Sequence, residues 1–152
     1  MRVVSYRTTG PTRLGIRKDG ALWEAGDFPA NSDGFGKLAA QVAAGELAPG
    51  RRVEGSWQAA LPLVADARII CLGLNYAEHA REGGREPPEY PAFFIRVDTS
   101  MIENGGTVPM PACSHKMDYE AELLVVIGKG GRDIREEDAL DHVFGYGLFN
   151  DI

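Results

Sequence analysis

Residues 118–131 have the sequence DYEAELLVVIGKGG, which predicts one long strand followed by a glycine-rich turn. The run at 123–127 is continuously apolar, so we expect it to be buried. Because side chains alternate across a strand, Asp118, Glu120 and Glu122 would share one face just before that run. The segment therefore predicts a core strand that carries acidic side chains at its start.

The sequence on either side of this strand predicts a mainly β fold with short helices, of the α+β class. Asp19-Gly20 is a strong hairpin signal between two short strands. Ser32-Asp33 is expected to cap a helix that Gly45 ends. A second helix over 136–143 would turn Ala139, Leu140 and Val143 inward. We predict strands at 3–6, 13–17, 21–24, 68–72, 92–97, 119–127 and 144–150, and helices at 35–44, 78–81 and 136–143.

Composition along the chain predicts two domains. A connector with Pro49-Gly50 separates the first part from the strand at 68–72, and we place the boundary near residue 65. This gives a small N-terminal α+β domain over 1–64 and a second domain over 65–152. The sequence stops directly after an apolar, aromatic stretch, and domains seldom end inside a core strand. We therefore expect the second domain to continue in a longer protein.

Charge and cysteine content limit the classes of function. The 152 residues include 16 basic and 22 acidic side chains, for a net charge of −6, which argues against a nucleic-acid surface. The two cysteines are too few for a disulfide framework. The N-terminus lacks a secretory signal, and no apolar run reaches the roughly 20 residues that cross a bilayer. We expect a soluble cytoplasmic protein with no nucleic-acid or membrane partner.

The acidic strand is a candidate metal site. Glu120 and Glu122 would lie roughly 6.5–7 Å apart at Cα, so both can reach one cation. Carboxylate oxygens prefer hard cations such as Mg²⁺, Mn²⁺ or Ca²⁺. The alternative is a solvated face of an edge strand. Against it, Glu122 directly precedes the run expected to be buried, where adjacent carboxylates repel unless a cation or protons compensate. Asp151 is a weaker candidate, since from its position alone an ordinary turn residue is the favoured explanation.

A second candidate is the pair His79 and Glu82, which would face each other across one helical turn. A carboxylate beside a histidine fixes the tautomer of the ring and raises its basicity, so the pair can activate water. The alternative is an ordinary surface contact. The glycine- and proline-rich loop at 83–91 would suit a lid over a substrate.

Four segments occur in a set order along the chain: RIICLGLNYAEHARE (68–82), PAFFIRVDTSMI (91–102), DYEAELLVVIGKGGRDI (118–134) and EEDALDHVFGYGLFND (136–151). Together they resemble the fumarylacetoacetate hydrolase superfamily. The resemblance covers residues 65–152, and residues 1–64 are similar to the small N-terminal domain of many bacterial members. It implies a mixed β roll, of which this chain holds the first half, usually in a homodimer.

The resemblance also implies roles for individual residues. Carboxylates at the positions of Glu120, Glu122 and Asp151 bind a divalent metal, which we expect to be Mg²⁺ before Mn²⁺ or Ca²⁺. Residues at the positions of His79 and Glu82 activate water. The expected substrate contacts are Tyr76 and Arg96, which stands where many members have lysine.

The resemblance implies several reactions. Members cleave a carbon–carbon bond in acylpyruvate-like 2,4-dioxo acids, or isomerise or decarboxylate related 2-oxo acids. Our leading hypothesis is hydrolysis through a metal-stabilised enolate, with water activated by the His–Glu pair. An isomerase or decarboxylase at the same site, a non-catalytic paralogue and a fragment without function are the alternatives.

Overall fold

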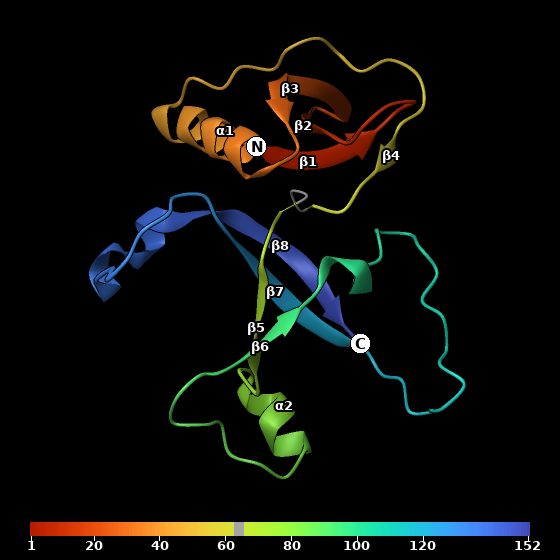
Figure 1. Cartoon of the computed structure of the whole chain (residues 1–152), viewed down its shortest axis with the longest axis vertical. Coiled ribbons are helices and arrows are strands. Elements are labelled where there is room, and N and C mark those ends of the chain that lie inside the picture. Colours follow the sequence, from red (N-terminus) through yellow and green to blue (C-terminus); the bar gives the residue numbers. More distant parts are fainter. Residues whose placement is uncertain (63–65) are drawn as a thin grey trace. The chain divides into compact units, whose positions relative to one another are not determined.

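The computed structural model describes residues 1–62 and 66–152, and it contains two compact units (Figure 1). One unit consists of Met1–Val64 and Ile102–Ile152, and the other of Ala65–Met101. The predicted boundary near residue 65 lies outside the described residues. The division into domains at 1–64 and 65–152 therefore stays a prediction.

A four-stranded sheet opens the first unit, in the order β3-β2-β1-β4. The predicted hairpin between its second and third strands is confirmed. Asp19 and Gly20 have positive φ angles of 51° and 76°, which a two-residue turn of this hand requires. The strands are β1 (Arg2–Arg7), β2 (Arg13–Lys18), β3 (Ala21–Pro29) and β4 (Gln58–Ala59).

Helix α1 (Ser32–Ala44) packs on this sheet and begins slightly earlier than predicted. Its N-cap is Asn31, whose side chain accepts the N–H of Gly34 at 2.9 Å, so Ser32-Asp33 is not the cap. Asparagine is as good an N-cap as serine or aspartate, and the residue with extended backbone geometry takes the position. The predicted end is confirmed, because Gly45 adopts the left-handed conformation after the last turn.

The core of the first unit lies between α1 and the sheet. Four side chains form its buried centre: Leu14, Ile16, Ala25 and Leu38. Phe35 on α1 meets Phe144 edge-on, with ring centroids 4.9 Å apart. This contact joins the start of the last strand to the N-terminal core, and so it helps to position that strand.

Replacing Leu38 with Ala should lower the free energy of unfolding by about 2–5 kcal/mol. Leu38 is 0% exposed, so the lost methyl groups leave a cavity in the core. Urea unfolding followed by circular dichroism measures the change. Lys37→Ala, an exposed neighbour on the same helix, is the control and should change stability by less than about 0.5 kcal/mol. Equal stability of the two variants would contradict the assigned core.

The first unit ends in a long antiparallel pair of strands. These are β7 (Glu120–Ile127) and β8 (Val143–Asp151), with the short 3₁₀ helix η2 (Glu136–His142) between them. The predicted inward face of η2 is wrong for Leu140, which is 74% exposed, and for Ala139, which is also exposed. A 3₁₀ turn does not follow the 3.6-residue period on which that prediction depended.

The apolar run on β7 is only partly buried. Even-numbered side chains from Glu122 to Val126 are half-buried, whereas Leu123 is 57% exposed and its cross-strand neighbour Leu148 is 89% exposed. A two-stranded ribbon has two faces, and the described residues cover one of them. The expectation of a fully buried strand is therefore wrong for the chain as it stands here. An exposed apolar face of this kind is typical of an interaction surface.

The second unit is a hairpin with a long insertion. Its strands β5 (Ile69–Gly73) and β6 (Ala92–Arg96) pair antiparallel, and helix α2 (Ala77–Glu82) and a proline-rich loop lie between them in sequence. The short helix η1 (Asp98–Ser100) follows. The predicted fold class, mainly β with few short helices, is confirmed. Among the described residues no helix is long and apolar enough to cross a membrane.

Candidate active site

The strand register brings the predicted carboxylates to one place. In the β7–β8 pair, Glu120 lies directly opposite Asp151, and Glu122 lies two residues further along the same face. Side chains of directly opposed residues have Cβ atoms roughly 4.5–5.5 Å apart. The three acids, which are far apart in sequence, therefore occupy neighbouring positions on one sheet face.

Burial differs among the three carboxylates. Asp151 is 6% exposed, Glu122 is half-buried and Glu120 is exposed. The strand pair is closed at this end by Asn150, whose side-chain oxygen accepts the backbone N–H of Glu120 at 3.1 Å. A buried aspartate at the end of a strand is not an ordinary turn residue, since acidic side chains are almost never fully buried without compensation.

The chemistry of this donor set fits a hard divalent cation. Like charges directly opposite each other on a sheet are destabilising, and the burial of Asp151 strengthens that repulsion. A cation between the carboxylates would remove it. Across residues 1–62 and 66–152, however, no three His, Cys, Asp or Glu side chains are gathered closely enough to hold an ion. The register fixes backbone positions, and ligation by all three acids stays a prediction.

Helix α2 places His79 and Glu82 on one face. The helix is held in place by Ala80, which is 0% exposed, while both His79 and Glu82 are exposed. Glu78 and Arg81 form an ion pair elsewhere on the helix surface. The predicted one-turn spacing is therefore present, and both side chains reach the surface of the helix. Their role in activating water stays a prediction.

The end of α2 is defined by hydrogen bonds that fix where the following loop departs. The N–H of Arg85 donates to the carbonyl of Ala80 at 2.8 Å, and that of Gly84 donates to Arg81 at 2.9 Å. Gly84 has a φ of +67°, as this helix ending requires. The helix therefore ends at Glu82, with Gly83 as its C-cap residue.

Replacing Gly84 with Val should loosen α2. A β-branched residue in the left-handed conformation costs roughly 1–2 kcal/mol, so hydrogen exchange of the α2 amides should accelerate about 5- to 30-fold. Exchange followed by mass spectrometry measures this. Gly83→Ala is the matched control, because Gly83 has an ordinary φ of −77° and an added Cβ meets nothing closer than 3.5 Å. Equal exchange in both variants would show that the helix does not depend on this ending.

The two expected substrate contacts lie at the ends of elements in the second unit. Tyr76 is the N-cap residue of α2 and is 40% exposed. Arg96 ends β6, and its guanidinium carbon lies 5.6 Å from the centre of the Phe94 ring. That contact restricts the arginine side chain to one side of the strand. Nothing in the geometry assigns either residue to a substrate, so both roles stay predictions.

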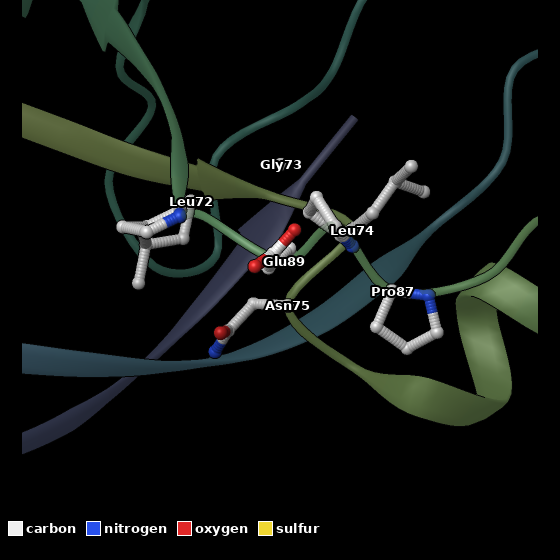
Figure 2. A pocket seen from close by; sticks show the side chains of 8 residues that line it. Leu72, Gly73, Leu74, Asn75, Pro87 and Glu89 are labelled. Carbon is white, nitrogen blue, oxygen red and sulfur yellow. The ribbon is translucent and has the colours of Figure 1, made fainter.

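Sequence reasoning missed one feature of this unit. A cavity of about 210 Å³ lies between the end of β5 and the proline-rich loop (Figure 2). The loop was predicted from its glycines and prolines, but Glu89 within it was not singled out. The prolines that bracket Glu89 were the available signal, because they fix the backbone around it. The lining residues are Leu72, Gly73, Leu74, Asn75, Pro87, Pro88, Glu89 and Pro91.

Comparison with known proteins covers most of the second half of the chain. The family model for the fumarylacetoacetate (FAA) hydrolase C-terminal domain matches residues 68–152, more than half of the chain. A caffeoylpyruvate hydrolase from Neonothopanus nambi is 44% identical over 89 residues, which is 55% of this chain and 31% of that protein. A mitochondrial oxaloacetate tautomerase from Xenopus laevis is 40% identical over 91 residues, which is 60% of this chain and 28% of that protein.

A solved structure extends the likeness to the whole chain. The crystal structure of a Mycobacterium smegmatis protein assigned as HpcE has a TM-score of 0.76 and 29% identity, and the match covers 99% of this chain and 55% of that one. The chain thus spans about half the length of this solved structure. It spans roughly a third of the length of the two curated relatives.

Proposed function

Because the chain belongs to the fumarylacetoacetate hydrolase family, we propose that it is part of a metal-dependent enzyme that hydrolyses a carbon–carbon bond in an acylpyruvate-like 2,4-dioxo acid. The observation that carries the proposal is the β7–β8 register, which sets Glu120 opposite the buried Asp151 within the matched segment. The relative named caffeoylpyruvate hydrolase supports this class of substrate.

In this proposal the acidic face of β7 and β8 holds the metal. Glu120, Glu122 and Asp151 would provide oxygen ligands, which favour Mg²⁺ and accept Mn²⁺ or Ca²⁺. A divalent cation bound there supplies Lewis-acid stabilisation of negative charge on the substrate's keto oxygens. Glu120 is exposed, Glu122 is half-buried and Asp151 is buried. The proposed ligand set would therefore be accessible to solvent on one side and protected on the other.

The helix α2 provides the proton transfers. A ring nitrogen of His79 takes a proton from water, and the carboxylate of Glu82 stabilises the imidazolium that forms. The water oxygen attacks the carbonyl carbon distal to the substrate carboxylate, and the bond from that carbon to the methylene breaks. The electron pair passes to the pyruvate part as its enolate, which then takes a proton at carbon. The products are a carboxylic acid and pyruvate.

The remaining expected contacts would orient the substrate. Arg96 carries the positive charge that a substrate carboxylate requires, and a guanidinium can bind it in a bidentate way. Tyr76 directly precedes α2, the helix that carries the His–Glu pair, and its side chain offers a hydroxyl group. Holding the substrate carboxylate in one place fixes which of the two carbonyls meets the water.

A second candidate reaction is keto–enol tautomerisation of a 2-oxo acid. The similarity to an oxaloacetate tautomerase favours it, and it needs enolate stabilisation and proton transfer but no attacking water. Decarboxylation is a third use of the same enolate. The three reactions differ in product, since only hydrolysis releases pyruvate with a second carboxylic acid, and only decarboxylation releases carbon dioxide.

The test is turnover of acetylpyruvate by the full-length protein. We expect the enol absorbance to fall with added Mg²⁺, to stay constant after chelation, and proton NMR to show acetate and pyruvate in equal amounts. Loss of absorbance without pyruvate would select the tautomerase. No reaction of acetylpyruvate or oxaloacetate with Mg²⁺, Mn²⁺ or Ca²⁺ would contradict the enzyme proposal.

We also propose a homodimer in the cytoplasm. The exposed apolar faces of the strand pairs support association, with Ile95 on β6 at 77% exposed and Leu148 on β8 at 89%. Light scattering of the full-length protein tests the dimer. The compartment rests on the sequence alone, and the related Xenopus laevis protein is named as mitochondrial.

A further inference from the structure

The cavity in the second unit is large enough for one ring-sized group. Its volume is about 210 Å³, and all eight lining residues lie within Ala65–Met101. An apolar protein cavity of roughly 150 Å³ is known to accommodate benzene. The cavity therefore suits a part of a small molecule, such as a phenyl ring or a short branched chain.

Three prolines restrict the backbone on one side of this cavity. Pro87, Pro88 and Pro91 have a fixed φ and no backbone N–H, so the loop side presents ring carbons and few donors. On the strand side, Leu74 has a φ of +54°, which residues with a side chain rarely adopt. Backbone conformations of this kind persist only where the surroundings hold them, and they cluster at ligand sites.

Two of the eight lining residues have polar side chains, and the backbone adds further polar surface. Glu89 is the single charged side chain among the eight lining residues, and Asn75 carries the single side-chain amide. In Figure 2 the Glu89 carboxylate lies between Leu72 and Pro87, with Asn75 below it. An ionised carboxylate only accepts hydrogen bonds, and it repels a second carboxylate. A group that enters the cavity beside Glu89 should therefore carry a hydrogen-bond donor and no negative charge.

The cavity is tied to the helix that bears the His–Glu pair. Asn75 lies two positions before Ala77, the first residue of α2, and Pro87 lies five positions after Glu82, its last. The two sides of the cavity are thus the segments that enter and leave α2. A substrate whose reacting carbonyl meets His79 would have its variable end within reach of this lining.

We propose that this cavity receives the acyl tail of the substrate, and that Glu89 selects tails bearing a hydrogen-bond donor over tails bearing a second carboxylate. The inference rests on the proposed function and narrows its substrate class. The favoured substrates are 2,4-dioxo acids with a hydroxyl- or amine-bearing ring or short chain. A concave lining with a few convergent polar groups is typical of small-molecule sites.

The experiment compares two aroylpyruvates that differ only in the ring substituent, 4-hydroxyphenyl and 4-carboxyphenyl, with acetylpyruvate as a substrate without a ring. For the full-length wild-type protein we expect kcat/KM for the hydroxyphenyl substrate to exceed that for the carboxyphenyl substrate about tenfold. Glu89→Gln should reduce the ratio to about threefold or less, mainly through KM. Glu89→Lys should reverse it in favour of the carboxylate.

The control is Glu86→Gln, a neighbour in the same loop that does not line the cavity. It should keep the wild-type ratio and the wild-type rate on acetylpyruvate. If acetylpyruvate turns over but Glu89→Lys keeps the wild-type ratio, the selection by Glu89 is wrong and the proposed function stands. If none of the three substrates reacts with any divalent metal, the proposed function fails, and this inference fails with it.

Discussion

Replacing Asp151 with Asn should lower kcat/KM for acetylpyruvate about 10²- to 10³-fold in the full-length protein, the equivalent of several kcal/mol of lost charge stabilisation. Asp151 is 6% exposed and directly opposite Glu120, so it is the carboxylate best placed to give a fixed ligand. The amide keeps the shape of the side chain but removes its charge. A steady-state assay at saturating Mg²⁺ measures the effect.

The matched control for this variant is Asp141→Asn, which makes the same chemical change at an exposed position on η2. It should leave kcat/KM within about twofold of wild type. In the presence of chelator, Asp141→Asn should melt as the wild type does, and Asp151→Asn should melt at the same or a higher temperature, because the amide removes the repulsion from Glu120. A full rate in Asp151→Asn would remove the aspartate from the proposed metal site.

Replacing His79 with Asn should lower kcat for hydrolysis about 10²- to 10⁴-fold, the range for loss of a general base. His79 is exposed on α2 and one helical turn from Glu82, so the change should leave the fold intact. Unlike the Asp151 variant, this one should keep the metal affinity of the wild type. Single-turnover kinetics and Mg²⁺-dependent thermal shifts separate the two effects.

His115→Asn is the control for the histidine prediction, since His115 is exposed and lies outside α2. Tautomerisation needs no attacking water, so comparing the tautomerisation and hydrolysis rates of His79→Asn is a second control. A His79→Asn variant that hydrolyses acetylpyruvate at the wild-type rate would show that another group activates water.

Local signals predicted most of the elements. Asp19-Gly20 marked the first hairpin, because few other dipeptides tolerate positive φ at both turn positions. The continuous apolar run on β7 marked a strand, and Gly45 marked a helix end. These features depend on residues close together in sequence, and so a single sequence carries them.

The errors have a common physical origin. The predicted burial of Leu140 and of the whole apolar run on β7 depended on the local pattern of apolar residues. Burial itself depends on which other elements pack against a helix or strand. Here the described residues cover one face of the β7–β8 pair. The cap at Asn31 in place of Ser32-Asp33 is a smaller error of the same type, because several good N-cap residues are adjacent and the tertiary path of the chain decides among them.

The candidate site was predictable to different degrees. The spacing of His79 and Glu82 is local, and α2 has the predicted face. The pairing of Glu120 with Asp151 joins residues far apart in sequence, so only the family resemblance pointed to it. Glu89 was missed because its significance comes from the cavity, which forms only when the loop returns to the end of β5.

The central claim is that the acidic face of β7 and β8 binds one divalent metal ion. Titration of Mn²⁺ into the metal-free, full-length protein, followed by electron paramagnetic resonance of the free ion, tests it directly. The account predicts one Mn²⁺ site per chain in the wild type, competition by Mg²⁺, and loss of the site in both Glu122→Gln and Asp151→Asn. Wild-type Mn²⁺ binding in both variants would contradict it.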